Sequence, residues 1–142
     1  MTQPGTRVLA LAVALVGMFA LTPAAAQTSD EARFSSLTLT LYTVKGTPSE
    51  HGSRLEKIAD GTLRCRPAGG DHHRPRAACN DMRKVNGFID LIGDVQQPCT
   101  GEYAPVYAVA EGYWQGDARL FGKVYPNRCE AVRSTGGSLF DI

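Results

Sequence analysis

The residues best suited to covalent or metal chemistry in this chain are its four cysteines and three histidines. The cysteines are Cys65, Cys79, Cys99 and Cys129. An even number is typical of disulfides in an exported protein, and the sequence-nearest pairing is one of three that are possible. The alternative is a zinc site that draws on His72 and His73, but the spacing from Cys65 to Cys79 matches no common zinc motif. We therefore expect two disulfides, no metal and no cofactor.

Nucleophilic catalysis would need a nucleophile, a base and an oxyanion site in one constellation. None of the three histidines stands beside a nucleophile motif such as Gly-x-Ser-x-Gly. His51 lies in a connection that contains glycine and proline, which is typical of a solvated loop. We therefore interpret the chain as a protein that is not an enzyme, with a hydrolase as the alternative.

The charge of the chain gives no sign of a nucleic-acid partner, because the formal net charge is only +1. Basic residues gather between Arg64 and Lys84, but Asp71 and Asp81 lie among them. This mixture indicates a solvated face. The alternative is a binding module for acidic polymers, whose binding would depend strongly on salt.

Residues 1–26 have the layout of a secretory signal peptide. Arg7 precedes an apolar run from Val8 to Leu21, and an alanine-rich segment ends at Ala26. A membrane-spanning helix needs about 20 apolar residues, and this run is shorter. Cleavage after Ala26 would leave one domain, residues 27–142, with 14 basic and 14 acidic residues. We expect a secreted, extracellular protein that has no membrane segment after cleavage.

Strand patterns dominate the expected domain. The alternation of apolar and hydroxyl residues over 36–44 has the period of two that a half-buried strand shows. The other expected strands cover 61–65, 106–110, 118–125 and 138–142. A segment through residues 112–116 joins two of them as a hairpin, in which Trp114 is expected to be a packing residue.

One amphipathic helix is predicted from Ala77 to about Leu91, after a loop over residues 66–76 that is rich in glycine and proline. The apolar positions of this helix recur at spacings of three and four, although Gly87 falls near its end. Hairpin-length connections favour antiparallel pairing, so the patterns predict an α+β fold in which a helix covers one face of an antiparallel sheet.

Three stretches, in the same order, resemble the Streptomyces subtilisin inhibitors: residues 37–41, residues 62–67 continuing to 77–79, and residues 99–140. The third stretch is the most specific because many of its positions fall in register without a gap. These positions are Cys99, Tyr103, Pro105, Val106, Trp114, Gln115, Gly116, Val124, Asn127, Cys129, Gly137 and Ser138. The resemblance covers essentially the whole expected domain.

The resemblance implies a five-stranded antiparallel sheet with one longer and one short helix packed on it. It implies the disulfides Cys65–Cys79 and Cys99–Cys129, and a homodimer formed through sheet faces. It also implies a secreted inhibitor of an extracellular serine protease, which acts through an exposed, substrate-like reactive loop. That loop comprises Pro98, Cys99, Thr100, Gly101, Glu102 and Tyr103.

In this register Gly101 is the primary specificity residue, and the bond open to cleavage joins it to Glu102. The resemblance assigns support of the loop to Asn127 and Cys129. A loop that is held extended before binding avoids the ordering cost of a flexible substrate, and it can add to the protease as a strand. The disulfide to Cys129 would keep both ends together after a cut.

Gly101 departs from the family pattern, which usually offers Met, Leu, Lys or Arg at this position. Three explanations follow. The target is a protease with a shallow pocket, or Glu102 enters the pocket of a glutamate-specific protease, or the chain is a non-inhibitory secreted protein-binding domain that keeps the same fold.

Overall fold

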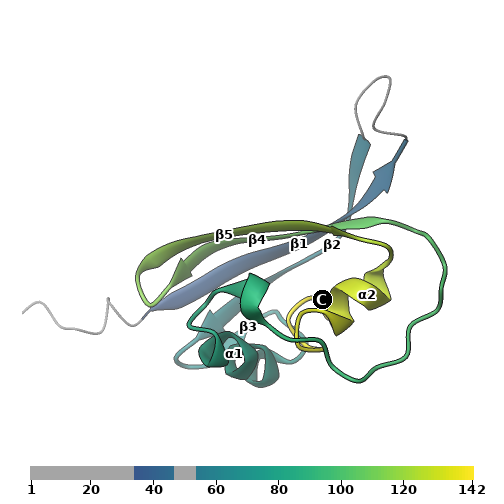
Figure 1. Ribbon diagram of the computed structural model, residues 1–142. Helices are drawn as coiled ribbons and strands as arrows, with labels where there is room; N and C mark the ends of the chain where they lie inside the picture. Colours follow the sequence, from purple (N-terminus) through teal and green to yellow (C-terminus); the bar gives the residue numbers. More distant parts are fainter. Residues whose placement is uncertain (1–33, 47–53) are drawn as a thin grey trace, which may run out of the picture.

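The structure is a computed structural model that describes residues 34–46 and 54–142 (Figure 1). The expected signal peptide, residues 27–33 and most of the expected connection over 45–53 lie outside the described residues. Within the part of the chain that is described, no helix is long and apolar enough to cross a membrane.

A five-stranded antiparallel sheet is the framework of the fold. In chain order its strands are β1 (Ser35–Lys45), β2 (Arg54–Cys65), β3 (Gly69–Gly70), β4 (Val106–Trp114) and β5 (Asp117–Tyr125). Their order across the sheet is β3-β2-β1-β4-β5, so β1 is central. The predicted α+β class and five-stranded sheet are confirmed.

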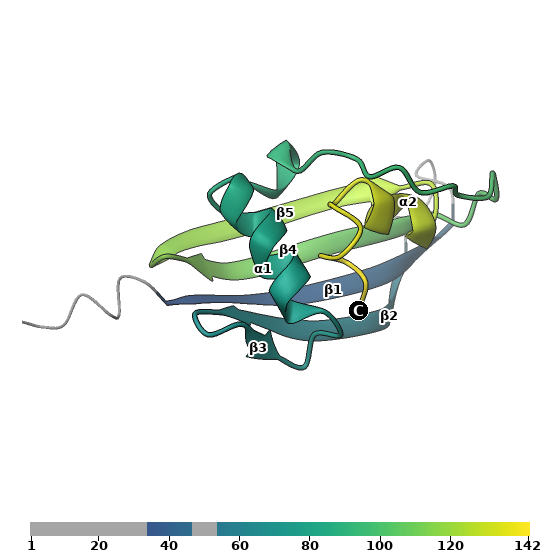
Figure 2. The same ribbon diagram turned by 90° about the horizontal axis from the view of Figure 1, so that it is seen from below.

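The alternation predicted for the first strand places the core. Leu37, Leu39 and Leu41 of β1 are buried, whereas Thr38 between them is exposed. The helices α1 (Pro75–Lys84) and α2 (Arg128–Arg133) and the short 3-10 helix η2 (Ile89–Leu91) all cover one face of the sheet (Figures 1 and 2). The sheet therefore has one covered face and one face that no described helix covers.

The predicted helix is shorter than its apolar pattern suggested. α1 ends at Lys84, because Asn86 and Gly87 adopt left-handed backbone conformations with φ of 48° and 81°. A side chain at Gly87 would also collide with Trp114, which packs against this glycine. Ile89 is buried after the break, so burial with helical spacing continues beyond the helix itself.

The expected strand over 138–142 is wrong. Leu139 and Phe140 are consecutive and both fully buried, which no strand with one covered face allows. Gly136 and Gly137, with φ of 80° and 75°, turn the chain so that the last residues pack on the sheet. The fifth strand is instead β3, inside the segment expected to be a loop, and β2 begins at Arg54 rather than at residue 61.

The predicted hairpin is confirmed. β4 and β5 pair from Val106–Tyr125 to Trp114–Asp117 and are joined by Gln115 and Gly116. Both turn residues have positive φ, as a type I′ hairpin turn requires. Trp114 is 2% exposed and is a packing residue, as expected.

Candidate functional site

The segment with the expected reactive-loop residues lies between η2 and β4 and runs along one side of the molecule (Figure 1). It has no regular secondary structure from Gly93 to Pro105. Its Pro98 and its residues 100–104 are exposed, and Tyr103 is 79% exposed. An exposed backbone of this kind is open to a partner.

Gly101 lies in the exposed part of this segment, and neither space nor backbone conformation requires a glycine there. A Cβ built on Gly101 would meet no heavy atom within 4 Å. Its φ lies outside the left-handed region in which side chains are strained. The position can therefore accept a larger side chain without a change in the fold.

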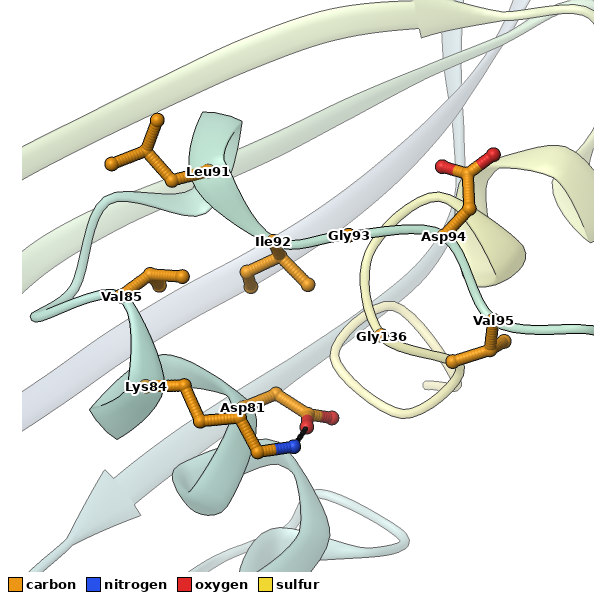
Figure 3. Close-up of a pocket in the computed structure, with 9 residues that line it drawn as sticks. All are labelled: Asp81, Lys84, Val85, Leu91, Ile92, Gly93, Asp94, Val95 and Gly136. Atoms are coloured by element: carbon orange, nitrogen blue, oxygen red, sulfur yellow. Dashed lines mark hydrogen bonds and ion pairs between the residues drawn. The ribbon is translucent and has the colours of Figure 1, made fainter.

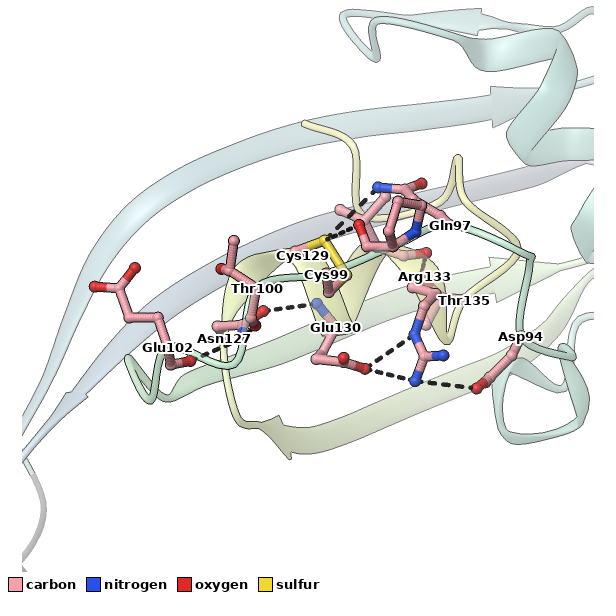
Figure 4. The surroundings of a disulfide bond; sticks show 12 residues. Asp94, Gln97, Cys99, Thr100, Glu102, Asn127, Cys129, Glu130, Arg133 and Thr135 are labelled. Carbon is pink, nitrogen blue, oxygen red and sulfur yellow. Dashed lines mark hydrogen bonds and ion pairs between the residues drawn. A yellow bond between two sulfur atoms is a disulfide. The ribbon is translucent and has the colours of Figure 1, made fainter.

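A disulfide ties the segment to α2 two residues before Gly101. Cys99 and Cys129 are bonded with a Cα–Cα distance of 5.7 Å, and Cys129 belongs to the first turn of α2 (Figure 4). The second disulfide joins Cys65 at the end of β2 to Cys79 in α1. Both bonds follow the sequence-nearest pairing.

Asn127 holds the backbone on both sides of Gly101. Its Nδ2 donates to the carbonyl oxygen of Thr100 at 3.2 Å and to that of Glu102 at 2.9 Å. Its Oδ1 accepts from the backbone N–H of Glu130 at 2.9 Å, so the same side chain caps α2 (Figure 4). Because one buried amide makes all three bonds, the loop and the helix are fixed relative to each other.

The downstream end of the loop is joined to the sheet by backbone hydrogen bonds. The N–H of Ala104 donates to the carbonyl of Pro126 at 2.9 Å, and the N–H of Val44 donates to the carbonyl of Pro105 at 3.0 Å. The loop therefore enters β4 in a fixed direction.

An ion-pair network at the other end of α2 was missed from the sequence. The Arg133 guanidinium lies 2.8 Å from a Glu130 carboxylate oxygen and 3.5 Å from one of Asp94, upstream of the loop. The i,i+3 spacing of Glu130 and Arg133 could have indicated their own pairing. No sequence signal could have found Asp94, because its contact depends on how the loop returns to α2.

Tyr125 lies two residues before Asn127 and ends β5 in a buried position. Burial raises the pKa of the Tyr125 hydroxyl to about 12, and the negative charges of Asp90 and Asp94 add to the shift. The hydroxyl is therefore neutral at all physiological pH values.

The buried histidine, His72, has a structural role. His72 is buried, with Nε2 3.0 Å from the carbonyl oxygen of Leu139, while Nδ1 accepts from the N–H of Arg74. His73 is exposed, and His51 lies outside the described residues. The cysteines are all in disulfides, and among the described residues no group of three His, Cys, Asp or Glu could hold a metal.

A hollow of about 370 Å³ lies between α1, η2 and the turn at Gly136 (Figure 3). Its apolar lining includes Leu91 and Ile92, and Asp81 is its most enclosed charged group. Asp81 is already paired with Lys84 at 2.9 Å and accepts from the Ser138 hydroxyl at 2.6 Å. With its carboxylate engaged in this way, we assign the hollow no role.

A comparison with known proteins gives a consistent picture. The model of the family described as subtilisin inhibitor-like matches residues 34–127. Subtilisin inhibitor-like protein 5 of Streptomyces fradiae is 34% identical over 106 residues, which cover 73% of this chain and 95% of that protein. Kexstatin-1 of Streptomyces platensis is 34% identical over 132 residues, covering 88% and 90%. A trypsin inhibitor of Streptomyces longisporus is 35% identical over 131 residues, covering 89% and 84%.

Among solved structures, the fold is similar to that of Streptomyces caespitosus sermetstatin in complex with Bacillus licheniformis subtilisin. The TM-score is 0.57 at 22% sequence identity, and the match covers 76% of this chain and 97% of that one. At this identity the likeness establishes the fold.

Proposed function

The chain belongs to the subtilisin inhibitor-like family, and we propose that it is a secreted inhibitor of an extracellular serine protease and not an enzyme. In this proposal residues 98–103 are the reactive loop and the bond between Gly101 and Glu102 is the one presented to the protease. The family relatives carry the names of protease inhibitors, and sermetstatin was solved with a subtilisin.

The observation that carries the proposal is the position of the Asn127 amide. Its two hydrogen bonds hold the carbonyls before and after Gly101, so the backbone is ordered before a protease arrives. Binding an ordered loop avoids the entropy cost that a flexible substrate pays. An extended, exposed backbone can then pair with the protease as an added strand.

The same contacts support slow turnover. Attack by the catalytic serine on the Gly101 carbonyl would break the bond to the Glu102 nitrogen and form an acyl-enzyme. The acyl side would stay tied to α2 through Cys99, and the amine side through Asn127 and the Ala104 N–H. The free amine would therefore remain close to the acyl group, which favours re-formation of the bond over release.

We propose that the target has a small or shallow primary pocket, of the elastase-like kind. Since the backbone at position 101 would accept a side chain, glycine there is a property of recognition and not of folding. A subtilisin-like protease with a deep pocket would lose the contact that a larger residue makes. A glutamate-specific protease that takes Glu102 is the alternative target.

We also propose that the protein is a homodimer through the uncovered face of the sheet. Tyr113, Leu120 and Val124 are 55%, 81% and 55% exposed on strands β4 and β5. Their register partners place all three on the face opposite the buried core. Large exposed apolar side chains that gather on one face of a sheet are typical of an interface. Sedimentation should give a dimer, and Leu120→Lys should give a monomer.

Secretion is the remaining part of the proposal. The layout of residues 1–26 predicts a signal peptide, and residues 27–142 would be the mature inhibitor domain. Two disulfides fit an oxidising extracellular compartment. Mass analysis of the exported protein should give an N-terminus at Gln27.

The test is a titration of the mature protein against subtilisin-, trypsin-, elastase- and glutamate-specific proteases. We expect stoichiometric loss of activity for a protease with a small pocket. Inhibition of the glutamate-specific enzyme alone would move the primary contact to Glu102. If no serine protease is inhibited, the chain is a non-inhibitory binding domain with the same fold.

A further inference from the structure

We propose that Arg133 is a positioning residue for the upstream arm of the loop, residues 94–100. The inference rests on the proposed function, because it concerns the same loop. Arg133 lies in the last turn of α2, whereas Cys129 and Asn127, which bond to Cys99 and to the loop carbonyls, lie at the other end of this helix (Figure 4). The helix therefore holds the loop at two separate places.

Three contacts join the upstream arm to the end of α2 and to the turn that follows it. The backbone N–H of Val95 donates to the carbonyl of Arg133 at 3.0 Å. The guanidinium of Arg133 lies 3.5 Å from a carboxylate oxygen of Asp94. A Cβ built on Gly137 would lie 2.9 Å from Val95 Cγ2, so the valine packs directly against this glycine.

Glu130 fixes the geometry of the guanidinium. The Nε and Nη2 of Arg133 donate to Glu130 Oε2 at 3.0 and 2.8 Å, which aims the same Nη2 at Asp94. The Arg133 side chain is 33% exposed and that of Glu130 24% exposed, so part of this network is shielded from solvent. A planar guanidinium can serve two carboxylates at once, which an ammonium on a flexible stem does less well.

The arm matters because it precedes the bond presented to the protease. Residues 96–100 would form the part of the loop that pairs with the enzyme as a strand, and Cys99 alone would fix them covalently. If Asp94 and Val95 move, residues 96–98 lose one of their two fixed ends. Arg133 therefore acts through Asp94 on loop order and touches no reacting group.

The experiment compares Arg133→Gln, Arg133→Lys and Asp94→Asn with the matched control Lys57→Gln. The control removes the exposed Lys57–Asp60 pair, whose side chains lie 3.0 Å apart in β2. The first readout is the backbone 15N order parameters of residues 96, 97 and 100 in the free protein. The second is the inhibition constant for the protease found by titration, with Tm measured for every variant.

We expect Arg133→Gln and Asp94→Asn to lower these order parameters and to weaken inhibition about two- to fivefold, the range of a partly exposed ion pair. Fivefold corresponds to about 1 kcal/mol. A variant that combines Arg133→Gln with Asp94→Asn should inhibit no more weakly than Arg133→Gln alone, and Arg133→Lys should inhibit more strongly than Arg133→Gln. Lys57→Gln should leave both readouts unchanged.

The inference is overturned if Arg133→Gln leaves the order parameters of the arm unchanged, or if Lys57→Gln alters them equally. It is also overturned if inhibition weakens only in proportion to Tm. If the wild-type protein inhibits no protease, the proposed function fails, while the relaxation data still decide whether Arg133 orders the arm.

Discussion

Replacing Gly101 by methionine should strengthen inhibition of subtilisin. The structure gives room for the change, because a Cβ at this position meets nothing within 4 Å and the backbone lies outside the left-handed region. The new side chain would enter the primary pocket of the protease and lose its contact with water. Burial of a side chain of this size contributes about 2–3 kcal/mol, which corresponds to about 30- to 150-fold tighter binding.

The assay is the inhibition constant for subtilisin, measured for wild type, Gly101→Ala, Gly101→Met and Gly93→Met. Gly101→Ala separates the effect of a stiffer backbone, about 0.5–1 kcal/mol, from filling of the pocket. Gly93 is the matched control, since it is exposed and a Cβ there also meets nothing within 4 Å. Equal effects of methionine at both positions, or no gain at Gly101, would refute the assignment of the primary specificity residue.

Three further predictions concern Asn127, the Cys99–Cys129 disulfide and Tyr125. Asn127→Ala should weaken inhibition and lower the free energy of unfolding by about 1 kcal/mol through the lost helix cap, whereas Asn127→Asp should keep the cap and weaken only inhibition. Urea unfolding and inhibition constants test this, and equal inhibition by both variants and wild type would contradict it. Replacing Cys99 and Cys129 by serine should lower the free energy of unfolding by just under 4 kcal/mol in the chain-entropy model and turn the inhibitor into a substrate. Urea unfolding and the recovery of protease activity with time would reveal the two effects, and an unchanged duration of inhibition would count against the prediction. The pKa of Tyr125 is raised from 10.0 to about 12, so its contribution to stability is present below about pH 10 and is lost as the pH rises towards 12. In urea unfolding Tyr125→Phe should lose less stability than wild type over this range, and identical pH profiles would contradict the shift.

The regular core of the fold could be predicted because its patterns are local. The period-two alternation of β1 and the short turn between β4 and β5 specify a strand and a hairpin without reference to the rest of the chain. The end of α1 could not be placed, because Ile89 continues the buried spacing after Asn86 and Gly87 have already turned the backbone. The expected closing strand failed for a related reason, since a short apolar run does not by itself specify a strand.

The site was predictable only where a resemblance supplied the register. The resemblance implied that Cys99 pairs with Cys129 and that Asn127 lies near the loop, and the structure places the Asn127 amide between two loop carbonyls. The contact of Asp94 with Arg133 joins residues that are far apart in the sequence. Neither residue belongs to a motif, so only the folded arrangement brings them together.

The most direct test of the central claim is to identify which bond the target protease cuts. The mature protein would be incubated with a limiting amount of the protease that it inhibits, and the products analysed by intact mass and N-terminal sequencing. The account predicts one slow cut with a new N-terminus at Glu102, and both fragments held together by the Cys99–Cys129 disulfide. A first cut at another bond, with Gly101–Glu102 intact during inhibition, would contradict it.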